Sequence, residues 1–127
     1  MPVHGIVVNV IAASAKDGIS VVKVNGYLDT TTATELEEAL FGLLKKESYR
    51  IVVDLSDTTY ISSAGWGIFI GEIKEIRNRG GDLKLAGMNG DVFEVFQLLE
   101  FQSILNAHDT TEEARLAFTT VTGKKSL

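Results

Sequence analysis

Two adjacent serines, Ser62 and Ser63, are the side chains of this sequence with the clearest chemical potential. They lie in the stretch YISSAGWGIF, which runs from Tyr60 to Phe69, between an apolar pair and a glycine-containing amphipathic run. A serine hydroxyl at such a boundary can cap a helix, attack a substrate or accept a phosphate. The choice among these depends on the elements that position the two serines.

The first possibility is that Ser63 caps a helix. Serine is among the preferred N-cap residues, because its oxygen accepts a hydrogen bond from a free backbone N–H. Phosphorylation, the last of the three possibilities, would use the same position as the cap. A helix start offers free N–H groups and a positive dipole, so it tolerates a phosphate well. A phosphate there would change the surface of the protein rather than its fold.

The second possibility is a nucleophile. Ser63 and the following Ala64-Gly65 match the end of the G-x-S-x-G elbow, but position 61 is isoleucine. The elbow also needs a histidine base, and the chain has only His4, near its start, and His108, before the last expected helix. These observations disfavour a serine hydrolase, and we expect no enzymatic activity.

Length and composition restrict the class of protein further. The 127 residues fit one domain, with a core over about residues 5–118 and a frayed tail over 123–127. The chain has no cysteine, which excludes thiolate metal sites and is compatible with the cytoplasm. It shows no signal peptide, no apolar run of membrane-spanning length and no nucleotide-binding or zinc motif, so we expect no cofactor and no metal. A net charge of -5 argues against nucleic acid or an anionic membrane as the main partner.

Hydrophobic periodicity and turn residues divide the chain into nine elements. The expected strands are Gly5–Ile11, Ile19–Asn25, Arg50–Leu55, Leu83–Ala86 and Ser103–Ala107; the expected helices are Thr30–Lys46, Ala64–Arg79, Asp91–Glu100 and a last one from Asp109 through Phe118; Ser56–Ser62 is expected to be a loop. The first two strands form an antiparallel pair. The alternation that follows predicts an α/β fold with a largely parallel sheet and crossover helices.

Helical spacing also indicates which side chains point inward and how the helices begin. The expected inward residues are Leu36, Ala39, Leu40, Leu43 and Leu44, then Trp66, Phe69, Ile70 and Ile73, then Val92, Val95, Phe96 and Leu99. Thr32 with Glu35, and Asp109 with Glu112, have the spacing of capping boxes.

The segment VVDLSDTTYISSAGWGIFIGEIKEIRNRGGDLKLAG closely resembles the signature region of STAS-domain anti-sigma factor antagonists, in which a D-S-S/T/A-G-L-G motif opens a helix. The segments VVKVNGYLDTTTATELEEAL and FQSILNAHDTTEEAR resemble two further parts of that family, so the resemblance covers about Gly5 to Phe118. It implies one STAS-like domain, with a mixed sheet flanked mainly on one side by helices.

The resemblance also implies a site. The serine after the family's aspartate is phosphorylated by the cognate anti-sigma factor, which is a serine kinase. The glycine register places that serine at Ser63 and puts Ser62 where the family has aspartate. Ser62 is therefore a second possible phosphate acceptor, and it lacks the negative charge of the family's aspartate. Trp66 stands in place of a leucine and is expected to fill core rather than to meet a partner.

The resemblance and the local sequence suggest residues that contact a partner. They are Asp29, Asp57, Thr58, Thr59, Ser62, Ser63, Ala64 and Gly65. Asp29 matches the family's G-x-L-D segment, but it equally suits a turn or cap. The three residues Asp57, Thr58 and Thr59 are expected in an exposed loop, where an ordinary polar turn is the alternative. Gly65 either allows close packing of the helix start or admits a partner backbone.

The implied function is a bacterial partner switch in the cytoplasm. The unphosphorylated protein would bind a serine-kinase anti-sigma factor and release that protein's client. Phosphorylation at Ser63 would switch it off, and a phosphoserine phosphatase would reset it. ATP and Mg²⁺ would belong to the kinase. The alternative is a phosphorylation-independent STAS interaction module in another signalling pathway.

Overall fold

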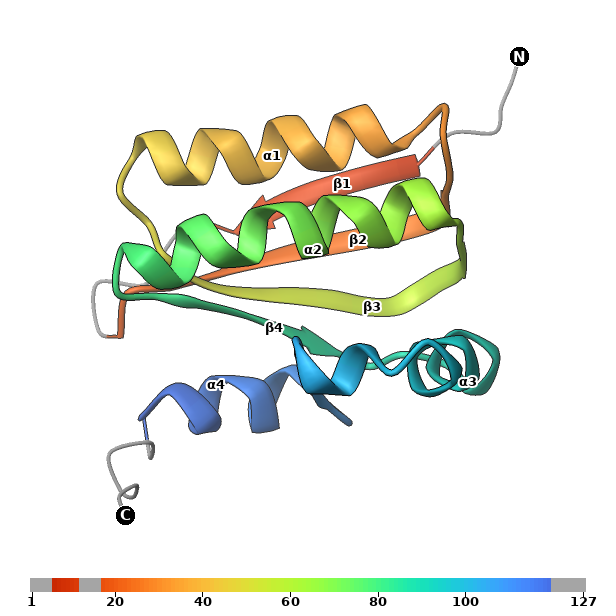
Figure 1. The fold of residues 1–127 in the computed structure, drawn as a ribbon. Helices are drawn as coiled ribbons and strands as arrows, with labels where there is room; N and C mark the ends of the chain where they lie inside the picture. Colours follow the sequence, from red (N-terminus) through yellow and green to blue (C-terminus); the bar gives the residue numbers. More distant parts are fainter. Residues whose placement is uncertain (1–5, 12–16, 120–127) are drawn as a thin grey trace.

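The computed structural model describes residues 6–11 and 17–119 (Figure 1). The expected frayed tail and the start of the first strand at Gly5 lie outside these residues. The elements are β1 (Ile6–Ile11), β2 (Ile19–Leu28), α1 (Ala33–Lys45), β3 (Arg50–Ile61), α2 (Ser63–Asn78), β4 (Asp82–Ala86), α3 (Gly90–Leu98), the 3-10 turn η1 (Phe101–Ser103), β5 (Asn106–His108) and α4 (Thr111–Thr119). The predicted order of strands and helices is confirmed, with η1 added.

The strands form one mixed sheet in the order β1-β2-β3-β4-β5. β1 runs antiparallel to β2, and the other three pairings are parallel. Each parallel pairing is joined by a crossover that contains a helix, as parallel strands require. All carboxyl ends of the parallel strands therefore lie at one edge of the sheet, where α2 begins.

Alternating side chains give the sheet two covered faces. Ile51, Val53 and Leu55 of β3 belong to the larger core cluster, to which α1, α2 and α3 all contribute, whereas Val52 belongs to a second cluster with Phe118 of α4. Figure 1 shows α1 and α2 over the sheet and α4 on the opposite side. The expected α/β fold with helices mainly on one side is confirmed.

The expected loop over Ser56–Ser62 is wrong, because β3 continues to Ile61. β3 pairs with β2 as far as Leu28↔Ile61, and the register between the two strands shifts twice. The shifts make Leu55, Thr58 and Ile61 point inward at a spacing of three instead of two. That spacing removes the alternation by which a strand is identified from sequence.

Three smaller expectations about the ends of elements are also wrong. Thr32 forms no capping box; its hydroxyl donates to the Tyr27 carbonyl (2.7 Å) and accepts from the Asp29 N–H (2.9 Å). The cap of α4 is Thr110, whose hydroxyl accepts from the Glu113 N–H (3.1 Å). The last strand, Asn106–His108, begins three residues later and ends one residue later than expected.

Most expected inward residues are buried or half-buried, but α3 is an exception. Val92 and Phe96 are buried, whereas Val95 and Leu99 are exposed. α3 packs through a narrow i, i+4 contact at the end of the sheet, so its wider apolar face stays outside. No helix among the described residues is long and apolar enough to cross a membrane. The described part of the chain also contains no cluster of three or more potential metal ligands.

Candidate functional site

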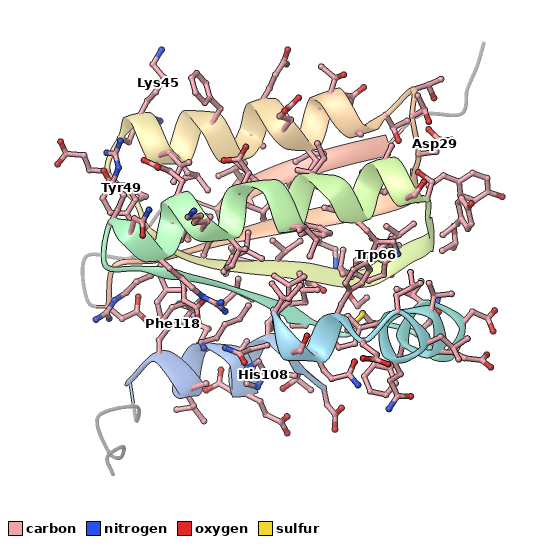
Figure 2. All side chains as sticks on the ribbon, in the orientation of Figure 1. Asp29, Lys45, Tyr49, Trp66, His108 and Phe118 are labelled. Carbon is pink, nitrogen blue, oxygen red and sulfur yellow. The ribbon has the colours of Figure 1, made fainter. Side chains whose placement is uncertain are left out.

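The candidate site lies where β2 and β3 end and α2 begins. The Ser62 N–H donates to the Leu28 carbonyl (2.8 Å), which holds the ends of the two strands together. Asp29 follows Leu28 directly, and Figure 2 shows it beside the start of α2. The structure therefore brings together Asp29 and the serine pair, which are far apart in the sequence. The carboxyl edge of parallel strands is a common place for binding sites.

The two serines have different roles at this junction. Ser62, not Ser63, is the N-cap of α2, with φ -84° and ψ 175°, and its Oγ accepts from the Gly65 N–H (3.4 Å). Ser63 is the first helical residue and is exposed. Its side chain makes no hydrogen bond to any described residue, so the hydroxyl is open to an approaching protein. The expectation that Ser63 itself caps the helix is wrong by one position.

This division predicts unequal costs for two alanine variants. Ser62→Ala should lower the free energy of unfolding by about 0.5–2 kcal/mol, as for a lost N-cap. Ser63→Ala should change it by no more than about 0.5 kcal/mol, as for an ordinary surface substitution. Urea titration of both variants beside the wild type measures the difference. A larger loss for Ser63→Ala than for Ser62→Ala would contradict the assignment of the cap.

Asp29 is held in the turn before α1. Its Oδ1 accepts from the Thr31 hydroxyl (2.8 Å), the Thr31 N–H (3.0 Å) and the Thr32 N–H (3.2 Å). The hydrogen bond from the Thr31 hydroxyl outweighs partial desolvation and holds the pKa of Asp29 below its usual value. The carboxylate is thus charged at neutral pH and held by the turn that follows β2. The structure thus shows Asp29 as a turn residue, which is one of the two roles expected for it. This position is compatible with the other expected role, contact with a partner.

Gly65 lies in the first turn of α2, on its buried side. A Cβ atom at this position would lie 2.8 Å from Leu28 Cγ and 2.9 Å from Ile61 Cγ2. The glycine therefore allows the helix start to sit directly on the ends of β2 and β3. Of its two expected roles, close packing is the one that the structure shows.

Trp66 is a core residue, as expected. It is 2% exposed, and its ring centroid lies 5.1 Å from that of Phe101 and 5.9 Å from that of Phe96. Its indole Nε1 is buried and has no acceptor among the described residues. Trp66 thus joins the first turn of α2 to α3 and η1.

The three residues expected in a loop before Ser62 lie instead on β3. Thr58 is fully buried, and its hydroxyl donates to the Val24 carbonyl (2.6 Å), so the expectation that it contacts a partner is wrong. Asp57 and Thr59 are exposed. Asp57 pairs with Lys23 (3.2 Å), and this hydrogen bond is the main cause of the raised pKa of Lys23. Asp57 and Thr59 remain available at the surface.

The structure adds a pair of aromatic residues that the sequence did not indicate. Tyr27 and Tyr60 are 55% and 53% exposed, and their ring centroids lie 6.3 Å apart in an edge-on arrangement. They face each other because β2 and β3 pair at Tyr27↔Tyr60. This register depends on the second shift in the ladder, so no local sequence signal could have identified the pair. Exposed tyrosines are typical of protein interfaces.

Among the described residues, no histidine is positioned as a base for Ser63. His108 is the last residue of β5, which β4 separates from β3. Figure 2 shows it near α4, away from Asp29 and the start of α2. Burial, followed by the charge of Lys84, lowers the pKa of His108. His4 lies outside the described residues. The geometry of the described residues therefore gives no support to a nucleophile elbow.

The chain matches a known domain family and two curated relatives from staphylococci. The model of the STAS domain matches residues 10–114. The curated anti-sigma-B factor antagonist of Staphylococcus aureus is 28% identical over 102 residues, covering 80% of this chain and 94% of that protein. The protein of the same name from Staphylococcus epidermidis is 29% identical over 91 residues, covering 72% and 84%.

Solved structures support the fold. An anti-sigma factor antagonist from Mycobacterium paratuberculosis superposes with a TM-score of 0.77 at 24% identity, covering 88% of this chain and 92% of that one. The unphosphorylated anti-sigma factor antagonist SpoIIAA superposes with a TM-score of 0.68 at 19% identity, covering 92% and 99%. SpoIIAA has also been solved in a phosphorylated form, which superposes with a TM-score of 0.64 at 17% identity. Because the family match spans well over half of the chain, the chain belongs to the STAS domain family.

Proposed function

We propose that this protein is an anti-sigma factor antagonist controlled by phosphorylation of Ser63. The observation that carries the proposal is the position of Ser63. It is the exposed first residue of α2 and makes no side-chain hydrogen bond to a described residue, while Ser62 makes the cap. The names of the two staphylococcal relatives support the same class of function.

The modification would act on the surface and not on the fold. A phosphate at the start of α2 faces free N–H groups and the positive end of the helix dipole, so the monomer tolerates it. It adds about -1.5 to -2 charges at a position that is otherwise neutral. The unmodified protein would bind a serine-kinase anti-sigma factor and release its client, and phosphorylation would end that binding. A phosphoserine phosphatase would reset the switch.

The proposed contact surface surrounds Ser63. It comprises Asp29, Asp57, Thr59, Ser62, Ser63 and Ala64, together with Tyr27 and Tyr60. Thr58 and Gly65 support this surface from below. ATP and Mg²⁺ would belong to the kinase, so this chain would carry out no catalysis itself. Because the proposed kinase uses ATP, the exchange would take place in the cytoplasm.

A second candidate function is a phosphorylation-independent STAS interaction module. Ser62 favours it, because a neutral hydroxyl stands where the resemblance implies a carboxylate beside the acceptor. In that case, the same surface would bind a partner without being modified.

Phosphate mapping separates the two candidates. With a serine-kinase anti-sigma factor and ATP, we expect the wild type and Ser62→Ala to take up one phosphate at Ser63, and Ser63→Ala to take up none. Mass spectrometry of the modified peptides identifies the site. Phosphate at Ser62 in the Ser63→Ala protein would contradict the assignment. Tight binding without any phosphate uptake would favour the second candidate.

A further inference from the structure

Helix α3 has more exposed apolar side chains than buried ones. Val95, Leu98 and Leu99 are 38%, 72% and 54% exposed. Their i, i+3 and i+4 spacing places them on one face of the helix, and we call these three residues the α3 stripe. Contiguous apolar surface of this kind marks an interaction site more often than isolated exposed residues do.

A small cavity opens at the N-terminal end of the α3 stripe. Its volume is about 110 Å³, and it is lined by residues 59–61 of β3, by Trp66, and by Asp91, Val92 and Val95 of α3. An apolar cavity of about 150 Å³ holds a benzene molecule, so this one is large enough for a single aliphatic side chain. The cavity lies directly beside the serine pair, because Ser62 and Ser63 follow residue 61.

The charge of this region is of one sign. Residues 85–114 contain six acidic residues and no lysine or arginine. The formal charge of this segment is therefore more negative than the net charge of -5 of the whole chain. Two of these acids, Asp91 and Glu94, lie on α3 next to the cavity and the stripe. Among the described residues, neither has an ion-pair partner. Such a surface attracts a basic partner and repels a second copy of itself or an anionic membrane.

We propose that the α3 stripe and its cavity receive a basic amphipathic helix of the partner. One aliphatic side chain of that helix fills the cavity, further apolar side chains cover Leu98 and Leu99, and lysine or arginine side chains face Asp91 and Glu94. The partner is the anti-sigma factor, and this identity rests on the proposed function. The chemistry of the docked segment rests on α3 alone.

Matched variants on α3 and α1 test this docking site. The α3 variants are Leu98→Asp and Glu94→Lys. The controls are Phe41→Asp and Glu38→Lys, which make the same kinds of change at exposed positions of α1. Each protein is titrated with candidate serine-kinase anti-sigma factors and with a synthetic helical peptide that has leucine on one face and lysine on the other. Trp66 is the only tryptophan and lines the cavity, so its fluorescence reports filling of the cavity.

We expect the α3 variants to weaken binding about tenfold or more and the α1 controls to change it by less than about twofold. Equal affinities for the two sets would overturn the docking site. Ser63→Asp in the same titrations separates the proposals: if it alone weakens binding, the switch stands and the docking site is wrong. If the α3 variants alone weaken binding, the docking site stands and the switch is wrong. If no anti-sigma factor binds the wild type, the proposed function fails and the peptide decides the docking chemistry.

Two further measurements test other occupants. Deletion of residues 120–127, followed by amide NMR, shows whether the chain's own end covers the stripe. A dimer in solution that Leu98→Asp dissociates would show that a second copy does. Either result would overturn the assignment to a basic partner helix.

Discussion

Replacement of Ser63 by aspartate is expected to leave the protein folded and to weaken its binding to the anti-sigma factor by roughly tenfold or more. In the monomer, the new carboxylate faces the free N–H groups at the start of α2, which is favourable by about 0.3–1 kcal/mol. In the complex, the same carboxylate must lose water in an interface, and an unpaired buried charge is costly. Stability should therefore hold or rise while affinity falls.

Calorimetry on the wild type, Ser63→Asp and the phosphorylated protein measures this divergence. Phosphate carries more charge and more acceptor oxygens than a carboxylate, so its effect should exceed that of aspartate. Ser63→Ala is the matched control and should bind like the wild type. Equal affinities for all four proteins would place Ser63 outside the interface.

Gly65→Ala is expected to lower the free energy of unfolding by about 1–3 kcal/mol, the usual cost of overpacking. The added methyl group would lie 2.8 Å from Leu28 and 2.9 Å from Ile61, and Leu28 is fully buried. Relief of this contact requires the start of α2 to move away from the ends of β2 and β3. Because Ser63 belongs to that turn, its rate of phosphorylation should fall as well.

Gly67→Ala provides the control two residues further along α2. Gly67 is exposed, and a Cβ atom there meets nothing within 4 Å. Alanine is more favourable than glycine inside a helix by roughly 0.5–1 kcal/mol, so this variant should be as stable as the wild type or more so. Thermal melts and phosphorylation rates of both variants test the pair. Similar behaviour of the two would show that close packing at Gly65 does not position the serine.

The sequence alone was sufficient for the order of elements and for the position of the serine pair at the junction of a strand and a helix. Local patterns carry both: β-branched runs identify the strands, i, i+3, i+4 repeats identify the helices, and Ser-Ser-Ala-Gly between them identifies the junction. The burial of Trp66 also followed from helical spacing. These features depend on residues within one or two turns of each other, which is the range that a pattern in the sequence can report.

The roles of individual residues at the site depended on tertiary contacts. Ser62 is the cap because its N–H bonds to Leu28 in β2 and so sets where α2 begins. Thr58 is buried because the shifted register of β3 turns it toward Val24. Tyr27 and Tyr60 meet through the same register.

The burial of side chains on helix α3 also depended on tertiary contacts. Val92, Val95, Phe96 and Leu99 have equivalent helical spacing, yet only Val92 and Phe96 are buried. Periodicity determines which residues share a face of a helix, but the area of that face that becomes buried depends on how closely the neighbouring elements approach. For this protein, the sequence by itself determined the chain of strands and helices and the serine pair at their junction. The strand register and the packing of α3 decided which hydroxyl caps the helix, which one makes no hydrogen bond to a described residue, and which apolar surface of α3 stays exposed, because those contacts join residues that are distant in the sequence.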